Sequence, residues 1–203
     1  MSMEKSLHEN FGHRKTIPPE IREVTLKALS FYPALKNVKI DFVFNENLRK
    51  SLMQAQPRVR SMYGSRKRRS YLIKIHRCFS MNGKKVPVHR LPENVLVGWI
   101  GHELGHIMDY LRKNNWSMML FGIGYYTSKS FIITAERAAD TYALDHKLGD
   151  YILATKEFIL TMGGISKSHI RRIKKLYLSP EEIMDMMLNR VSENPGMSAK
   201  ITT

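Results

Sequence analysis

The chain contains a single cysteine, Cys78, among its 203 residues. One cysteine excludes an intramolecular disulfide and any cysteine-rich zinc module. The chain is nevertheless long enough to bury a sizeable hydrophobic core without such a cross-link. Residues 1–15 are polar and lack the apolar stretch of a secretory signal, so we expect an intracellular, cytoplasmic protein in a reducing environment.

Long hydrophobic runs are also missing. The most apolar stretch, residues 116–134, is interrupted by Lys129 and contains two glycines. Its first part, residues 116–126, is free of charge but too short, because a membrane-spanning helix needs about 18 or more apolar residues. We therefore expect no transmembrane span. The stretch is predicted to be buried or interfacial, which leaves peripheral contact with a membrane open.

Acidic residues are absent between Glu46 and Glu93, although the whole chain carries 18 Asp and Glu beside 33 Lys and Arg. Residues 47–92 contain 13 of these basic residues, and the rest of the chain is close to neutral. Such a block is often a solvated face that keeps a protein soluble. It can also face an anion, so acidic peptides, phospholipid headgroups and nucleic acid are alternative partners.

Apolar periodicity predicts the elements of the first half of the chain. Alternation predicts strands over residues 38–44 and 71–77, and helical spacing predicts a helix over residues 21–29. Residues 45–56 are interpreted as a short helix that stops before a proline. Residues 1–16 are expected to form a flexible tail.

The second half of the chain is predicted to be helical, with helices over residues 92–114, 131–148, 150–162, 168–178 and 179–191 and a flexible tail over residues 193–203. Strands early and helices late are typical of an α+β fold. We therefore expect a single domain over residues 17–192, in which a small N-terminal sheet precedes a helical C-terminal part.

An HExxH motif, His102-Glu103-Leu104-Gly105-His106, lies inside the helix predicted for residues 92–114. Residues four apart on a helix share one face, so both imidazoles can bind the same Zn²⁺ ion. Glu103 then lies beside the open coordination position, where it can act as general base for a metal-activated water. The plain alternative is a helix on which two histidines face a polar pocket.

A third ligand is available in the ERAAD sequence of residues 136–140, on the next predicted helix. A catalytic zinc needs three protein ligands and a water, and its histidines need acceptors for their other N–H groups. Glu136 can provide the third bond, and Asp140 can orient a histidine. Glycine weakens a helix, so we expect the second helix to approach the first closely at three glycines, Gly98, Gly101 and Gly105.

Together, the HELGH and ERAAD sequences resemble those of the gluzincin clan of zinc metallopeptidases. Within this clan, the run that begins at Glu136 is similar to the helix pair of the CAAX-prenyl-protease and HtpX-like family and of the soluble minigluzincins. The resemblance covers residues 92–162, about a third of the chain. It implies a zincin-like catalytic domain with an active-site helix followed by a glutamate helix.

The resemblance also implies a role for single residues. His102, His106 and Glu136 match the metal ligands, Glu103 matches the catalytic base, and Asp140 matches the carboxylate behind the ligands. The strand before the active-site helix, residues 71–77 here, would pair with an extended substrate. The donor for a transition-state oxyanion is left open among five residues: His169, Arg171, Arg172, His146 and Tyr142.

These observations predict a zinc-dependent endopeptidase that acts on a peptide or protein substrate. The basic block would make the cleft select for acidic substrates. Two alternatives stay open: a nucleic-acid-associated metalloprotease that uses residues 47–92, and a zinc-binding interaction module without turnover. The sequence predicts no oligomeric state.

Overall fold

The computed structural model describes residues 8–48, 51–63, 65, 68–81, 84–113, 128–161 and 167–193. Its main sheet contains β1 (Lys15–Thr16), β2 (Lys39–Phe44), β3 (Met53–Pro57) and β4 (Ser70–Ile75), and a separate antiparallel pair contains β5 (Cys78–Met81) and β6 (Lys84–Pro87). The helices are α2 (Arg22–Ser30), α3 (Glu93–Arg112), α5 (Lys129–Asp145), α6 (Gly149–Thr161), α7 (Lys167–Leu176) and α8 (Pro180–Glu193). Strands early and helices late confirm the α+β class.

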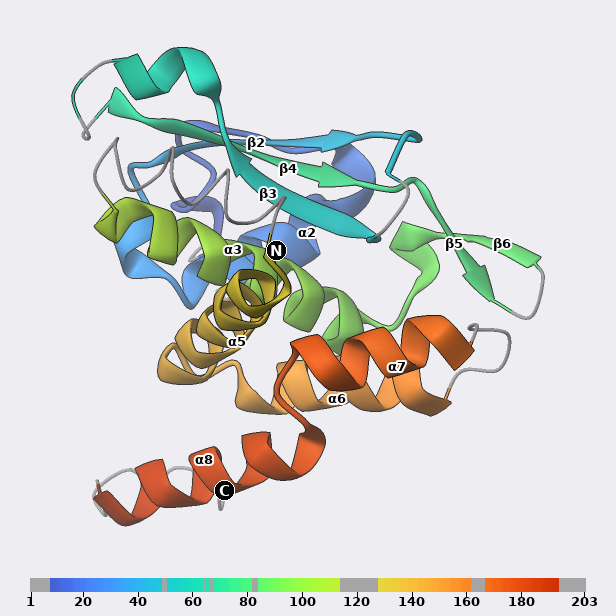
Figure 1. Ribbon diagram of the computed structural model, residues 1–203. Coiled ribbons are helices and arrows are strands. Elements are labelled where there is room, and N and C mark those ends of the chain that lie inside the picture. Colours follow the sequence, from blue (N-terminus) through green and yellow to red (C-terminus); the bar gives the residue numbers. More distant parts are fainter. Residues whose placement is uncertain are drawn as a thin grey trace.

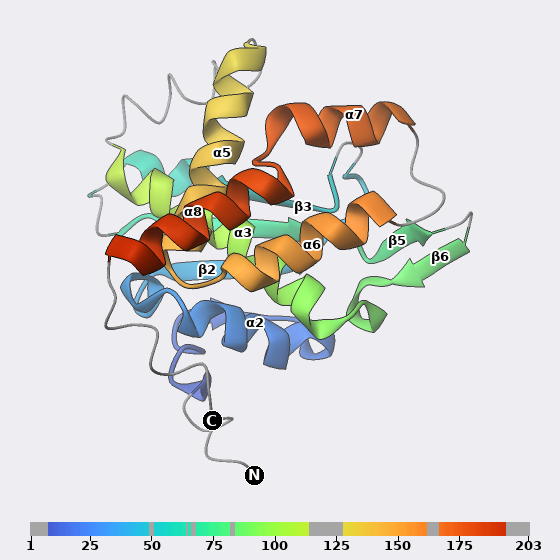
Figure 2. The ribbon, with the colours of Figure 1, turned by 90° about the horizontal axis from the view of Figure 1, so that it is seen from below.

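The long helix α3 lies at the centre of the molecule. The four-stranded sheet lies on one side of α3, while α5, α6 and α7 lie on the other (Figure 1). Seen from below, α6 and then α8 cover α3 on the side away from the sheet (Figure 2). A single hydrophobic core joins the inner face of the sheet to α2 and α3, and its largest buried side chains include Phe42, Tyr71, Ile73, Ile100 and Leu104.

The strand order in the main sheet is β1-β2-β4-β3, so β4 is an inner strand and β3 is an edge strand. β4 pairs in parallel with β2 on one side and antiparallel with β3 on the other. The prediction of a strand near residues 71–77 is confirmed. Its predicted role as a substrate-binding rim is wrong, because both of its edges are already paired within the sheet.

The short helix predicted for residues 45–56 is also wrong, because β3 occupies the end of that segment. Within β3, Met53 and Ala55 are buried and alternate with partly exposed glutamines, which is the period of a strand. Pro57 cannot donate a ladder hydrogen bond, and an edge strand tolerates it. The weak apolar character of methionine and alanine hides this alternation in the sequence.

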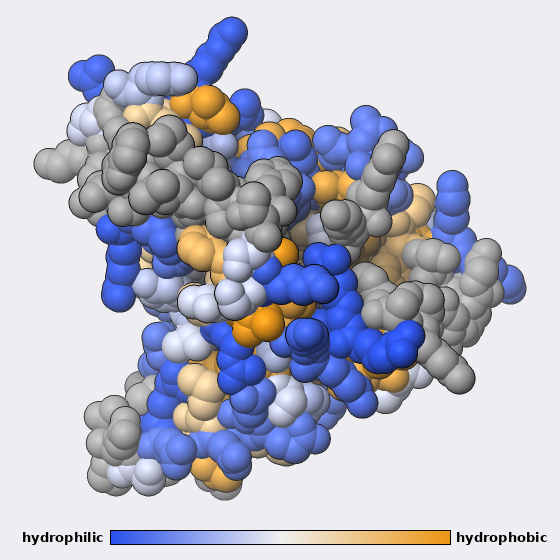
Figure 3. Space-filling view, viewed as in Figure 1, coloured by the Kyte–Doolittle hydropathy of each residue, from blue (hydrophilic) through white to orange (hydrophobic). Residues whose placement is uncertain are grey.

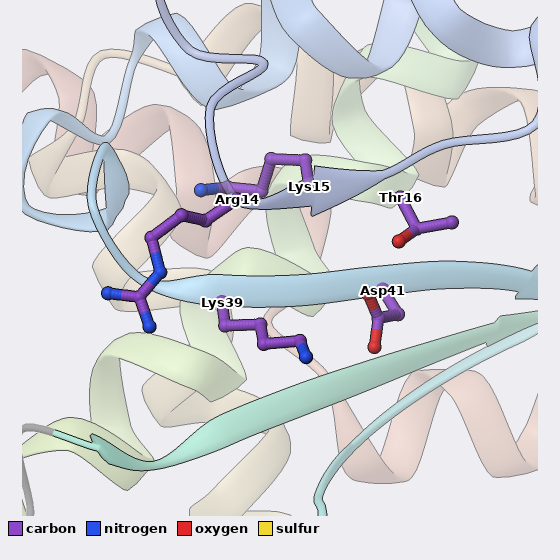
Figure 4. Close-up of a pocket in the computed structure, with 5 residues that line it drawn as sticks. All are labelled: Arg14, Lys15, Thr16, Lys39 and Asp41. Atoms are coloured by element: carbon purple, nitrogen blue, oxygen red, sulfur yellow. The ribbon is translucent and has the colours of Figure 1, made fainter.

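The segment expected to be a flexible tail, residues 1–16, is partly incorporated into the sheet. Lys15 and Thr16 form β1, which pairs in parallel with β2. The Lys15 ammonium lies within hydrogen-bonding distance of four backbone carbonyls, and the carbonyl of Val38 is the nearest at 2.6 Å. A cavity of about 360 Å³ lies beside β1, lined by Arg14, Lys15, Thr16, Lys39 and Asp41 (Figure 4). It therefore belongs to the β1 edge of the sheet, opposite β3.

The predicted helices of the second half are confirmed, with ends that shift by a few residues. The largest shift is at the end of α5, which stops at Asp145 and is followed by Lys147 with a φ of 64°. None of the helices in the described residues is both long and apolar enough to cross a membrane. Residues 114–127, which include most of the apolar stretch discussed above, lie outside the described residues.

The prediction that the helix of Glu136 approaches α3 at three glycines is confirmed at Gly105 alone, because Gly98 meets α6 and Gly101 meets the side chain of Leu148 between the two helices. A Cβ atom on Gly105 would lie 2.4 Å from the carbonyl oxygen of Ala139 on α5. A Cβ on Gly98 would lie 2.1 Å from the carbonyl oxygen of Tyr151 on α6. These contacts fix the position of α5 and α6 relative to the HExxH motif.

Candidate metal centre

Helix α3 carries the HExxH motif in its middle, where the helix is buried on all sides. It begins after Pro92, and Glu93 in its first turn has a charge that suits a helix amino end. His102, Glu103 and His106 are each only 5–6% exposed. Buried polar groups need partners, so these three side chains must be satisfied by neighbouring elements or by a ligand.

Helix α5 places Glu136 against the two histidines. The ligand atoms of His102, His106 and Glu136 all lie within 4.8 Å of one another. The Glu136 Oε2 atom lies 3.1 Å from His102 Nε2 and 3.4 Å from His106 Nε2. The three residues predicted as metal ligands are therefore brought together, and the group can hold a metal ion.

The two distances from Glu136 suit a tetrahedral ion. Zinc–ligand bonds of about 2.0–2.1 Å directed to the corners of a tetrahedron place the ligand atoms about 3.3–3.4 Å apart. The two distances from Glu136 to the imidazoles are close to this value. Two imidazole nitrogens and one carboxylate are also a donor set used by catalytic zinc sites. The residues present thus offer a donor set that a metal ion such as zinc can use, although the three ligand atoms are spread over as much as 4.8 Å.

Asp140 lies behind His102, one helical turn beyond Glu136 on α5. Its Oδ1 atom lies 2.8 Å from His102 Nδ1, which leaves the Nε2 atom of that ring directed at Glu136. Burial on its own lowers the pKa of His102, but Asp140 and Glu136 outweigh it and raise the pKa to about 10. The contact with Asp140 fixes the orientation of the His102 ring, and a metal ion would have to displace the proton from its Nε2 atom.

Lys156 on α6 was not predicted, and it completes the surroundings of Asp140. Its ammonium lies 2.9 and 3.2 Å from the two carboxylate oxygens of Asp140, and the backbone N–H of Leu178 donates to the same group at 3.1 Å. Burial raises the pKa of Asp140, but Lys156 and His102 hold it below its usual value. The carboxylate is therefore kept charged although it is fully buried.

Glu103 lies beside the histidines and is held by the edge strand. The backbone N–H of Ala55 on β3 donates to Glu103 Oε2 at 2.6 Å. Burial raises the pKa of Glu103, and the opposing charges of His106 and His102 only partly reverse this. A carboxylate whose pKa is raised toward neutrality accepts a proton more readily, which suits a general base.

His106 makes a different set of contacts from His102. Its ring stacks on Tyr110 at 6.1 Å between ring centres, and the Tyr110 hydroxyl donates to the carbonyl of Ala55. Its Nδ1 atom is buried without a hydrogen-bond partner among the described residues. The orientation of His106 is thus set by packing against Tyr110 and by Glu136.

The five candidate oxyanion donors are not brought to the metal ligands by any contact that the structure describes. The His146 ring stacks on Tyr32, and the Tyr142 ring lies under Arg112. Arg171 and Arg172 are exposed on α7, and the side chain of His169 lies outside the described residues.

Tyr177 is the aromatic residue that lies beside His102 instead, with 5.4 Å between ring centres. The Lys156 ammonium lies 4.1 Å from the centre of the same ring. In the sequence, Tyr177 follows Ile170 and Ile173 at helical spacing, just past the end of α7. This spacing predicts that Tyr177 packs against the fold, but it does not predict contact with His102.

The chain was compared with protein-family models, with curated proteins and with solved structures, and no match was found. The chemistry of the site must therefore be inferred from its own residues.

Replacing Asp140 with asparagine should weaken zinc binding by about 10–100-fold, because the ligand His102 loses a charged acceptor. The measurement is zinc affinity by competition with a chromophoric chelator, on protein whose fold is verified by circular dichroism. Asp150 to asparagine, at the start of α6, is a matched control on an exposed residue. Unchanged affinity in the Asp140 variant would show that His102 does not depend on Asp140.

Proposed function

We propose that the chain is a zinc-dependent endopeptidase of gluzincin type, with a zincin-like catalytic domain and an intracellular site of action. The observation that carries this proposal is the convergence of His102, His106 and Glu136 from two helices, with Glu103 beside them. A purely structural zinc site is closed by four protein ligands, whereas a catalytic site keeps one position open. Within the described part of the chain the cluster has three ligands, which supports the catalytic alternative.

The proposed reaction is hydrolysis of a peptide bond. Bound zinc would polarise the scissile carbonyl and lower the pKa of a water molecule. Glu103 takes the proton from the attacking water and then delivers it to the leaving amine. The Ala55 N–H group holds the Glu103 carboxylate during these transfers, so β3 contributes to the orientation of the base.

The substrate is proposed to lie along β3 rather than along the inner strand β4. β3 is the edge of the main sheet that adjoins the site, since Ala55 contacts both Glu103 and Tyr110. The backbone N–H and C=O groups of the even-numbered residues of β3 point toward β4. The hydrogen bonds at either end show this, because the Leu52 carbonyl accepts from the His76 N–H and the Arg58 N–H donates to the Ser70 carbonyl. The backbone groups of the odd-numbered residues are therefore directed outward. Those of Ala55 are engaged by α3, so an extended peptide can pair with the backbone of Met53 and with the carbonyl of Pro57, at the two ends of the strand.

The basic block of residues 47–92 gives less support to a nucleic-acid partner than its composition indicates. Arg69 is buried and donates to the backbone carbonyls of Tyr110 and Lys113 near the carboxyl end of α3. Arg58 pairs with Asp41, and Arg77 lies 3.7–3.8 Å from Glu20 and Glu46. These three charges have partners within the fold, and among the described residues no observation favours this alternative.

Metal analysis and peptide cleavage test the proposed function directly. We expect about one equivalent of zinc per chain and cleavage of members of a peptide library. A chelator should abolish the cleavage, and added zinc should restore it. Zinc binding without cleavage of any peptide would favour the non-catalytic interaction module. Cleavage that survives full removal of metal would overturn the proposal.

A further inference from the structure

The outward face of α7 is strongly basic. Residues 167–176 contain five Lys and Arg and no acidic residue. Ile173 and Leu176 are buried against the fold, whereas four cations are exposed: Arg171, Arg172, Lys174 and Lys175. We call these four residues the α7 basic face.

These four charges are not neutralised by neighbouring side chains that the structure describes. In the described part of the chain, none of them has an ion pair or a hydrogen-bonding side-chain partner. Lys174 acts on one exposed acid, Glu181, whose pKa is lowered mainly by hydrogen bonds and less by the charge of Lys174. This contrasts with Arg58, Arg69 and Arg77, whose partners were described above.

The α7 basic face adjoins the metal centre. The helix ends at Leu176, and the next two residues contact the site directly: the Tyr177 ring lies beside His102, and the Leu178 N–H donates to Asp140. In Figure 1, α7 lies below β3 on the side that faces the viewer, and in Figure 3 the same area of the surface is deep blue. The carboxyl end of α7 therefore leads directly into the metal centre, which β3 adjoins from the sheet side.

We infer that the α7 basic face is a docking surface for acidic side chains of the protein substrate on one side of the cleaved bond. This inference rests on the proposed function and adds the substrate class. An extended peptide advances about 3.3 Å per residue, and a ten-residue helix is about 15 Å long. Side chains within roughly five residues of the cleaved bond are thus in range of the α7 cations.

An acidic peptide fits this surface better than an anionic membrane. A membrane-binding amphipathic helix inserts apolar side chains from the face that meets the lipid. On α7 the described apolar residues, Ile170, Ile173 and Leu176, are partly or fully buried against the fold. The exposed face offers charge alone, and charge alone mainly accelerates association with an oppositely charged partner.

The test compares peptides that share a cleavage site and carry four glutamates or four glutamines beside it. We expect wild-type kcat/KM to be about tenfold higher for the acidic peptide at low salt and nearly equal for both at high salt. Lys174→Gln combined with Lys175→Gln should lower this ratio at least threefold. Lys36→Gln combined with Lys39→Gln removes the same charge from exposed positions near the β1 edge and should leave the ratio unchanged.

Failure of this inference can be separated from failure of the proposed function. Binding of the same peptides, labelled with a fluorophore, is measured by anisotropy on the Glu103→Gln protein, which needs no turnover. Loss of acidic selectivity in the α7 variant alone supports the inference even where no peptide is cleaved. Equal selectivity in both double variants would overturn it. Binding to phosphatidylserine vesicles that depends on Lys174 and Lys175, without peptide selectivity, would also overturn it in favour of a membrane.

Discussion

Replacing Glu103 with glutamine should leave zinc bound and lower the rate of peptide hydrolysis by about 10²–10⁴-fold. Glu103 is not among the three clustered ligands, so the ion keeps its protein donors. The amide keeps the size of the carboxylate and can still meet the Ala55 backbone, but it cannot accept the proton of the attacking water. Zinc content and kcat/KM on one library substrate, measured on the same preparation, check this result.

The controls for this prediction separate the base from the ligands. Glu157→Gln changes an exposed acid on α6 and should alter neither zinc content nor rate. His102→Ala, His106→Ala and Glu136→Ala should each lose both zinc and activity, because each removes one of three ligands. Full zinc retention in Glu136→Ala would show that the carboxylate is not a ligand, and substantial hydrolysis by Glu103→Gln would remove Glu103 from the mechanism.

Alanine at Gly105 should lower the free energy of unfolding by about 3 kcal/mol or more, at the upper end of the cost of overpacking. The added Cβ would lie 2.4 Å from the carbonyl oxygen of Ala139, which is backbone and cannot swing aside. Helix propensity alone predicts the opposite, a gain of about 1 kcal/mol. Urea denaturation followed by circular dichroism measures which of the two wins.

Gly101→Ala provides the matched comparison within the same helix. There the new Cβ would meet Leu148 Cδ1 at 2.7 Å, the far end of a flexible side chain that can rotate away. The loss at Gly101 should therefore be clearly smaller than at Gly105. A Gly105 variant that is more stable than the wild type would show that α3 and α5 do not meet as closely as described.

The metal cluster could be predicted from the sequence because its spacing is local. His102 and His106 are one turn apart on one helix, and Glu136 and Asp140 are one turn apart on another, so each pair follows from helical geometry. The meeting of the two helices was also encoded locally, in Gly105 and Ala139, whose small size permits close contact. A catalytic zinc needs three protein ligands, and this requirement is enough to predict that the glutamate of the second pair joins the two histidines of the first.

The remaining parts of the site depend on contacts between distant segments. Lys156 reaches Asp140 from a different helix, and a lysine in a sequence is normally expected to be exposed. Strand order is equally invisible: β3 follows β2 in the chain, yet β4 inserts between them. Alternation in residues 38–44 and 71–77 predicts two strands and their buried faces, but it carries no information about which strand ends at an edge.

The outer edge of β3 has a consequence for self-association. An unpaired strand edge is a template on which another copy of the same chain can add and start an aggregate. At Ala55 both backbone groups are already engaged by α3, the N–H by Glu103 and the carbonyl by Tyr110, and Pro57 offers no donor. At the opposite edge, β1 is only two residues long. The contacts of Ala55 therefore leave only the two ends of β3 open to an added strand, which suits a short stretch of substrate but not a long intermolecular sheet.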